Sequence, residues 1–158
     1  MFRLFNKVSS KDLLLSQLFD ESSFYGKFKH DLTNSRTEVL IESPFMTAYR
    51  TRTLIPIIRR LTKKGVVVRI NTREPKHHTP QLRREAWVAV GMLQQAGAKV
   101  YLCNDLRHRK FAVIDGAILW EGSLNILSQS RSCELMRRTY SPALCVQLLK
   151  FTKAKNKF

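Results

Sequence analysis

The segments that decide the fold of this chain are HRKFAVID, residues 108–115, and GSLN, residues 122–125. Side chains alternate between the two faces of a β-strand, so His108 and Lys110 are expected on the same face. The serine and the asparagine of the second segment are also two apart, and they follow a glycine. A cation, a hydroxyl and an amide that converge can hold the oxygens of a phosphate. An imidazole beside them can attack phosphorus as a covalent nucleophile.

Upstream of these segments, buried strands alternate with amphipathic helices. The pattern predicts strands at residues 37–43, 66–71 and 99–103, separated by helices at 54–64 and 81–96. This order is typical of parallel strands whose connecting helices cover the sheet. A glycine follows each helix and is expected to end it.

Downstream, the alternation stops. Strands joined by short turns are predicted at residues 109–114, 117–121 and 133–139, so this part of the sheet should be antiparallel. A last helix, with a proline in its first turn, is predicted at 142–153. The fold class is therefore α/β, with a mixed β-sheet flanked by helices.

The N-terminal part is predicted to be helical. Leucines recur at helical spacing after Lys11, and a second helical stretch is expected over residues 22–32. We divide the chain into an N-terminal helical extension, residues 1–36, and a catalytic domain, residues 37–158, within one compact unit.

The composition is that of a folded and strongly basic domain. The 158 residues include 28 Lys and Arg against 12 Asp and Glu, a net charge of +16, and 44% are hydrophobic. Such a charge attracts polyanions, either nucleic acid or an anionic membrane surface. The chain shows no apolar run of transmembrane length and no secretory signal, so we expect no stable membrane association and a cytoplasmic location.

The cysteines and tryptophans are assigned to the interior. Cys103, Cys133 and Cys145 form no CxxC pair and are expected as buried free thiols in a reducing compartment. Trp87, on the predicted 81–96 helix, and Trp120 are expected in the core.

The two polar segments resemble the phospholipase D superfamily, whose motif is HxK, four residues, Asp, and then Gly-Ser-x-Asn. The matching positions are His108, Lys110, Asp115, Gly122, Ser123 and Asn125. The resemblance covers residues 37–139, and Glu134 is similar to the family's trailing glutamate. It implies a phospholipase D-like α/β/α sandwich. The details are most similar to single-motif nucleases and to modules found beside helicases.

The resemblance also implies roles for these residues. His108 would form a phosphohistidine, and Lys110 and Asn125, with Ser123, would bind the phosphate. Glu134 would hydrogen-bond a histidine and fix its tautomer. Asp115 is interpreted as structural support. No metal or cofactor is implied, because lysines and amides neutralise the oxyanion.

The chemistry needs two histidines on opposite sides of phosphorus, because one imidazole cannot both attack and protonate the leaving oxygen. The chain contains one HxK, so a symmetric homodimer is predicted. The alternative is that His77 or His78 supplies the second imidazole.

Three readings of the substrate remain open. The chain could be a metal-independent nuclease on DNA or RNA, a phospholipid-hydrolysing enzyme, or a nucleic-acid-binding module with weak or no catalysis. The charge favours nucleic acid, with DNA preferred. The arginines predicted to contact the backbone of the nucleic acid are Arg50, Arg52, Arg109, Arg131, Arg137 and Arg138.

Overall fold

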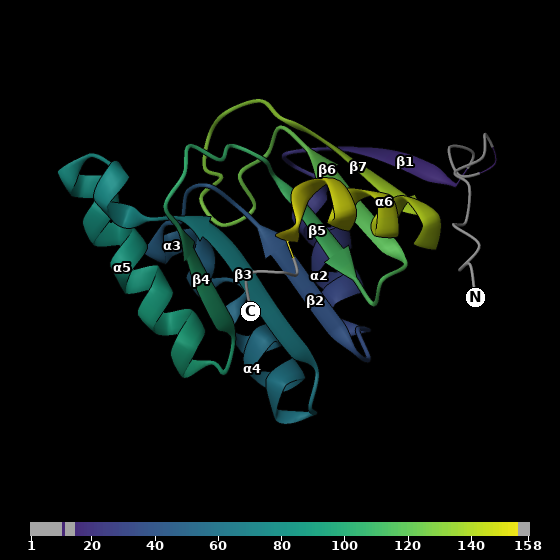
Figure 1. Cartoon of the computed structure of the whole chain (residues 1–158), viewed down its shortest axis with the longest axis horizontal. Coiled ribbons are helices and arrows are strands. Elements are labelled where there is room, and N and C mark those ends of the chain that lie inside the picture. The colour runs from purple at the N-terminus through teal and green to yellow at the C-terminus, as the bar shows by residue number, and fades with distance from the viewer. Residues whose placement is uncertain (1–10, 12–14, 155–158) are drawn as a thin grey trace.

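The computed structural model describes residue 11 and residues 15–154, which build a seven-stranded sheet with helices on both faces (Figure 1). The strands are β1 (Ser16–Asp20), β2 (Glu38–Glu42), β3 (Val67–Arg73), β4 (Lys99–Cys103), β5 (Phe111–Ile114), β6 (Ile118–Gly122) and β7 (Leu135–Tyr140). The helices are α2 (Phe24–Thr33), α3 (Ala48–Arg52), α4 (Ile55–Lys63), α5 (Pro80–Gln95) and α6 (Pro142–Thr152), with a 3-10 turn at Pro75–His77. The strand order is β1-β7-β6-β5-β2-β3-β4.

The parallel half of the sheet is as predicted. β2 pairs in parallel with β3, and β3 with β4. Apolar side chains of these strands join those of α2, α4 and α5 in one large core. The helices α4 and α5 end just before Gly65 and Gly97, whose φ angles of 86° and 88° lie in the region that favours glycine.

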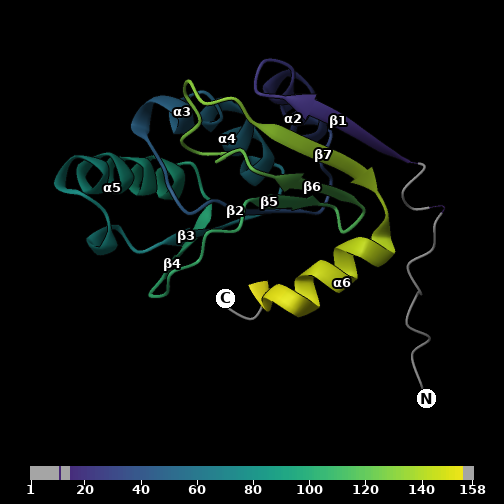
Figure 2. The same cartoon turned by 90° about the horizontal axis from the view of Figure 1, so that it is seen from above.

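The antiparallel half confirms the mixed sheet. β5 pairs antiparallel with β2 and with β6, and β6 with β7. Figure 2 shows α6 on the face of the sheet opposite to α2, α4 and α5. There α6 covers a second core that contains Leu40, Phe111, Val113 and Leu119. The chain is therefore an α/β/α sandwich.

The helix predicted after Lys11 is wrong for residues 16–20, which form β1 at the edge of the sheet. β1 pairs antiparallel with β7. Leu18 is 59% exposed, whereas Phe19 packs on Trp120, which is the alternation of a strand with one buried face. Pairing with β7, a partner distant in sequence, overrides the local leucine spacing. The start of the predicted helix, at residues 12–14, lies outside the described residues.

The second helical stretch is confirmed by α2, which begins at Phe24. β1 extends the same sheet and α2 packs in the same core as the later elements. The division into an extension and a catalytic domain at residue 36 stays a prediction.

Of the two tryptophans, only Trp120 lies in the core. It is fully buried, and its Nε1 donates to Oδ2 of Asp31 at 3.0 Å. The prediction for Trp87 is wrong, because its side chain is 49% exposed on α5. The residues of α5 that are buried are Ala86, Ala89, Val90 and Leu93.

All three cysteines are free thiols. Cys103 and Cys145 are buried as predicted. Cys133 is exposed in the loop before β7, so that part of the prediction is wrong. Over the described ranges, none of the helices combines the length and the apolar composition needed to cross a bilayer.

Candidate active site at the carboxyl edge of the sheet

His108 and Lys110 lie at the edge of the sheet where β2, β3 and β4 end. β5 runs antiparallel to β2, and its first residue, Phe111, pairs with Glu42, the last residue of β2. The segment before β5 therefore emerges at that edge. The predicted strand began at residue 109, whereas β5 begins at Phe111, so both polar residues precede it.

The side chains of His108 and Lys110 are in direct contact. Nζ of Lys110 lies 2.7 Å from Nδ1 of His108 and donates to the His108 carbonyl oxygen at 2.6 Å. An ammonium group only donates, so Nδ1 accepts and a neutral imidazole carries its proton on Nε2. Burial lowers the pKa of Lys110, and the negative charge of Glu134 opposes this shift. His108 is exposed and Lys110 half-buried, so an anion can reach both.

The Gly-Ser-x-Asn segment lies next to this pair. Gly122, at the end of β6, donates its N–H to the Lys110 carbonyl oxygen at 3.4 Å. A Cβ atom at Gly122 would overlap the carbonyl oxygen of Leu135, so only glycine fits there. Oγ of Ser123 accepts from the Leu135 N–H at 3.0 Å. Oδ1 of Asn125 is buried, with no hydrogen-bond partner in the described part of the protein.

Glu134 lies just before β7 and near Lys110. Its carboxylate accepts from Oγ of Ser132 at 2.7 Å, and its N–H donates to the carboxylate of Glu21 at 2.8 Å. Among the residues that the structure places, none of its hydrogen bonds reaches His108. The predicted role of Glu134 in fixing a histidine tautomer stays a prediction.

Asp115 lies at the other end of β5 from His108. Its carboxylate accepts from the hydroxyls of Ser35 and Thr37 and from the N–H groups of residues 36–38. Burial raises the pKa of Asp115, but these hydrogen bonds outweigh it and the pKa is lowered overall. The carboxylate ties the turn after β5 to the start of β2, which supports its interpretation as structural.

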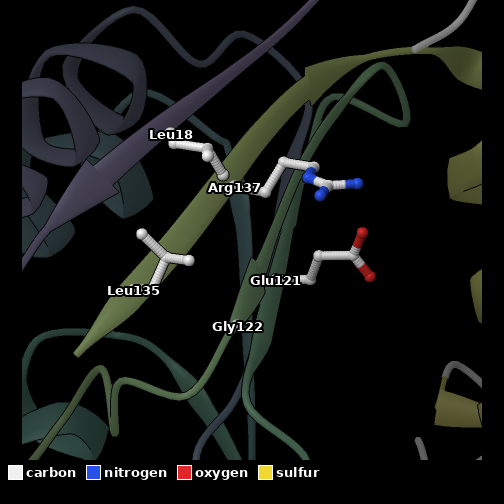
Figure 3. Close-up of a pocket in the computed structure, with 5 residues that line it drawn as sticks. All are labelled: Leu18, Glu121, Gly122, Leu135 and Arg137. Atoms are coloured by element: carbon white, nitrogen blue, oxygen red, sulfur yellow. The ribbon is translucent and has the colours of Figure 1, made fainter.

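Four of the arginines predicted to bind substrate are exposed: Arg52, Arg109, Arg131 and Arg137. Figure 3 shows Arg137 beside a groove on the sheet, lined also by Leu18, Glu121, Gly122 and Leu135. A neighbouring hollow shares Glu121 and Gly122 with this groove and is lined by Arg109 and Lys110. The groove at Arg137 therefore adjoins the hollow that Arg109 and Lys110 line.

Three of the six arginines make side-chain contacts within the fold: Arg50, Arg109 and Arg138. Nε of Arg50 donates to the Gln129 carbonyl oxygen at 2.8 Å, and its guanidinium lies 4.0 Å from the centre of the Tyr25 ring. Nε of Arg138 donates to the buried carboxylate of Asp31 at 2.7 Å. Arg50 therefore holds the loop at Gln129, and Arg138 pairs with a carboxylate of the core.

Glu42, a fully buried carboxylate at the end of β2, was not predicted from the sequence as a site residue. Its Oε1 lies 2.7 Å from Nε of Arg109, and its Oε2 lies 3.2 Å from Nη1 of Arg107. Nδ2 of Asn71, on β3, donates to Oε2 at 3.3 Å. A glutamate at the end of an apolar strand was the available signal, because a buried carboxylate requires paired partners.

The two loop histidines differ in their surroundings. Nε2 of His77 lies 2.8 Å from Oδ1 of Asn104. His78 is 7% exposed, and burial, with nearby basic groups, lowers its pKa. Its ring lies 5.0 Å from the Phe45 ring, which in turn lies 5.9 Å from the His108 ring. Within the residues described, no three His, Cys, Asp or Glu side chains gather as they would around a metal ion.

Comparison with known proteins assigns this chain to a family. The profile described as "Cardiolipin synthase, PLD-like domain" matches residues 28–154. No protein of curated function matches the sequence significantly.

Solved structures share the fold. Nuc from Salmonella typhimurium, a phospholipase D family member, has a TM-score of 0.72 at 16% identity, over 90% of this chain and 94% of that chain. NucT from Helicobacter pylori has a TM-score of 0.69 at 20% identity, over 90% and 96% of the two chains. Phosphatidylserine synthase from Haemophilus influenzae has a TM-score of 0.64 at 14% identity, over 90% of this chain and 38% of the other. With most of its length matched by the family profile, the chain belongs to the phospholipase D-like family.

Proposed function

We propose that this protein is a nuclease, a phosphodiesterase that hydrolyses the DNA or RNA backbone through a phosphohistidine at His108. The observation that carries the proposal is the contact of His108 with Lys110, next to Ser123 and Asn125, at an open edge of the sheet. Family membership supports phosphodiester chemistry. The net charge of +16 supports a polyanionic substrate, with DNA favoured.

In the first step, Nε2 of His108 attacks phosphorus while Lys110 and Asn125, with Ser123, hold the non-bridging oxygens. When Lys110 turns from Nδ1 of His108 to the phosphate, Nδ1 becomes free to carry the imidazole proton, and Nε2 presents its lone pair. The bond from phosphorus to the leaving oxygen breaks, and that oxygen takes a proton from a second imidazole. Water then attacks the phosphohistidine, the P–N bond breaks, and the second imidazole takes the proton of the water.

The second imidazole is assigned to His108 of another copy of the chain, so the site is completed by a homodimer. In-line displacement requires the acid opposite the nucleophile. The alternative donors are His77 and His78. The surroundings of His78 support the homodimer over a role for His78, because its ring is buried against Phe45.

The test is a cleavage assay in EDTA on labelled single- and double-stranded DNA, RNA and anionic phospholipid vesicles. The parent and a control, His30→Ala, which removes an exposed histidine of α2, should cleave nucleic acid. His108→Ala should bind DNA but not cleave it. Unchanged cleavage by His108→Ala would contradict the proposed mechanism. Release of lipid head groups without cleavage of nucleic acid would show that the substrate is a phospholipid.

A mixing experiment tests the shared site. Parent protein is refolded with increasing amounts of His108→Ala, so that subunits exchange. Activity should fall as the square of the fraction of parent protein, because a mixed dimer holds only one His108 imidazole. A linear fall, or a monomeric mass in solution for the active species, contradicts the homodimer.

A further inference from the structure

We infer that Glu42 is a positioning residue for the proposed nucleophile: its buried carboxylate holds the His108 segment through the arginine on each side of His108. The inference rests on the proposed function, in that it assigns to Glu42 a part in the reaction of His108.

The segment that carries His108 is not held by the sheet. Between the end of β4 and Lys110, residues 104–109 make no backbone-to-backbone hydrogen bond in the structure as described. An extended segment without such bonds opens and shifts at low free-energy cost unless side chains hold it. The position of the imidazole must therefore come from side-chain contacts.

The side chains that anchor the segment alternate with those that face the substrate. Arg107 and Arg109 turn to the carboxylate of Glu42, and the side chain of Arg107 is only 5% exposed. His108 and Lys110, one position out of phase, contact each other on the open side. A backbone whose side chains are fixed at residues 107 and 109 presents residue 108 between them in one direction.

The contact with Glu42 is a two-point clamp. Each carboxylate oxygen accepts from one arginine, Oε1 from Arg109 at 2.7 Å and Oε2 from Arg107 at 3.2 Å. Arg107 is held further by Asp105, at 2.7 Å and 2.6 Å. Charge-assisted hydrogen bonds of this kind are short and directional.

The clamp is fixed to a buried strand in the interior of the sheet. Glu42 is the last residue of β2, between β3 and β5, and is fully buried. Asn71, its register partner on β3, donates to the same carboxylate. The sheet thus fixes the carboxylate, the carboxylate fixes both arginines, and the arginines fix the imidazole between them.

The experiment compares Glu42→Gln and Glu42→Asp with the parent, using a labelled DNA oligonucleotide. Glutamine keeps the shape but offers only one acceptor oxygen and turns its amide N–H groups toward a guanidinium. We expect kcat to fall on the order of 100-fold with KM little changed, because misplacing a reacting group by about 1 Å costs that much. Aspartate keeps the charge, but its shorter side chain cannot reach both arginines, so rescue should be partial.

Two controls separate positioning from general stability. Glu38→Gln removes another carboxylate of β2, which pairs with Arg69 at 3.2 Å at the other end of the strand, and it should leave kcat unchanged. The double variant Glu42→Gln/Arg109→Met should be no slower than Glu42→Gln, because both changes release the same clamp. If Glu42→Gln does not fold, Arg109→Met tests the outer half of the clamp instead, because the Arg109 side chain is 42% exposed. Its kcat should fall while its KM changes little.

A second readout does not depend on nuclease activity. The imidazole NMR signals of His108, assigned by their loss in His108→Ala, should shift or broaden in Glu42→Gln and stay unchanged in Glu38→Gln. Unchanged kcat and unchanged His108 signals in folded Glu42→Gln would overturn the positioning role, as would an equal loss of kcat in Glu38→Gln. If the parent protein cleaves no nucleic acid, the proposed function is wrong. The NMR comparison would still decide whether Glu42 positions His108.

Discussion

Lys110 donates a hydrogen bond to Nδ1 of His108 across 2.7 Å, so the proposed phosphate-binding cation and the proposed nucleophile are directly coupled. The lysine selects the Nε2–H tautomer, in which the nitrogen proposed to attack still holds a proton. We therefore propose that a phosphate that draws Lys110 away both binds to the site and activates His108.

The first prediction concerns this coupling. In Lys110→Met, we expect cleavage to fall by roughly 100- to 1000-fold, the cost of removing one donor to a developing oxyanion. In the parent, imidazole ¹⁵N shifts should report the Nε2–H tautomer of His108, and added inorganic phosphate should move the population toward Nδ1–H. A parent protein that already shows Nδ1–H without phosphate contradicts the coupling.

The second prediction compares two glycines. Gly122→Ala forces a Cβ onto the Leu135 carbonyl, and we expect a loss of about 3 kcal/mol of unfolding free energy together with the loss of cleavage. Gly91→Ala, inside α5, adds a Cβ with no atom within 4 Å, and it should stabilise the protein by about 1 kcal/mol with cleavage unchanged. Urea unfolding of both variants checks this, and equal effects at the two positions would contradict it.

The third prediction separates two neighbouring arginines of β7. Arg137→Met, at an exposed residue beside the groove, should weaken DNA binding and lower the slope of log K against log salt by about 1. Arg138→Met removes the ion pair of buried Asp31, so it should cost about 3 kcal/mol of unfolding free energy and leave the slope unchanged. Salt titrations of DNA binding and urea unfolding measure the two effects, and a lower slope in Arg138→Met would reverse the assignment.

The fourth prediction concerns acid stability. The pKa of Asp115 is lowered in the folded protein, so the folded state binds this proton less tightly than the unfolded state. Its stabilisation is therefore complete above the unfolded value near 3.8 and is lost as pH falls through the folded pKa. Asp115→Asn, which tolerates the φ of 52°, should cost about 2 kcal/mol at pH 7 and flatten the acid limb of stability against pH. An acid limb identical to that of the parent would show that this carboxylate does not contribute.

Much of the fold follows from local patterns. The parallel strands, their helices and the glycines that end α4 and α5 were all predicted, because buried strands and amphipathic helices carry distinct periods along the chain. β1 could not be predicted in this way, since it pairs with β7, more than a hundred residues away. The prediction for Trp87 was wrong because α5 buries Ala86, Ala89, Val90 and Leu93 instead.

The sequence by itself determined the class of the fold and which polar groups its motif can present, because residue type and spacing decide which side-chain atoms a segment carries. It identified His108 and Lys110 but not the side chains that hold them in position. Only the tertiary structure decided that β2 ends beside the segment before β5 and that Glu42 pairs with two arginines there. It also decided that Arg138 pairs with Asp31. Such pairings depend on strand register, which is set by contacts between residues far apart in the chain and leaves no local pattern.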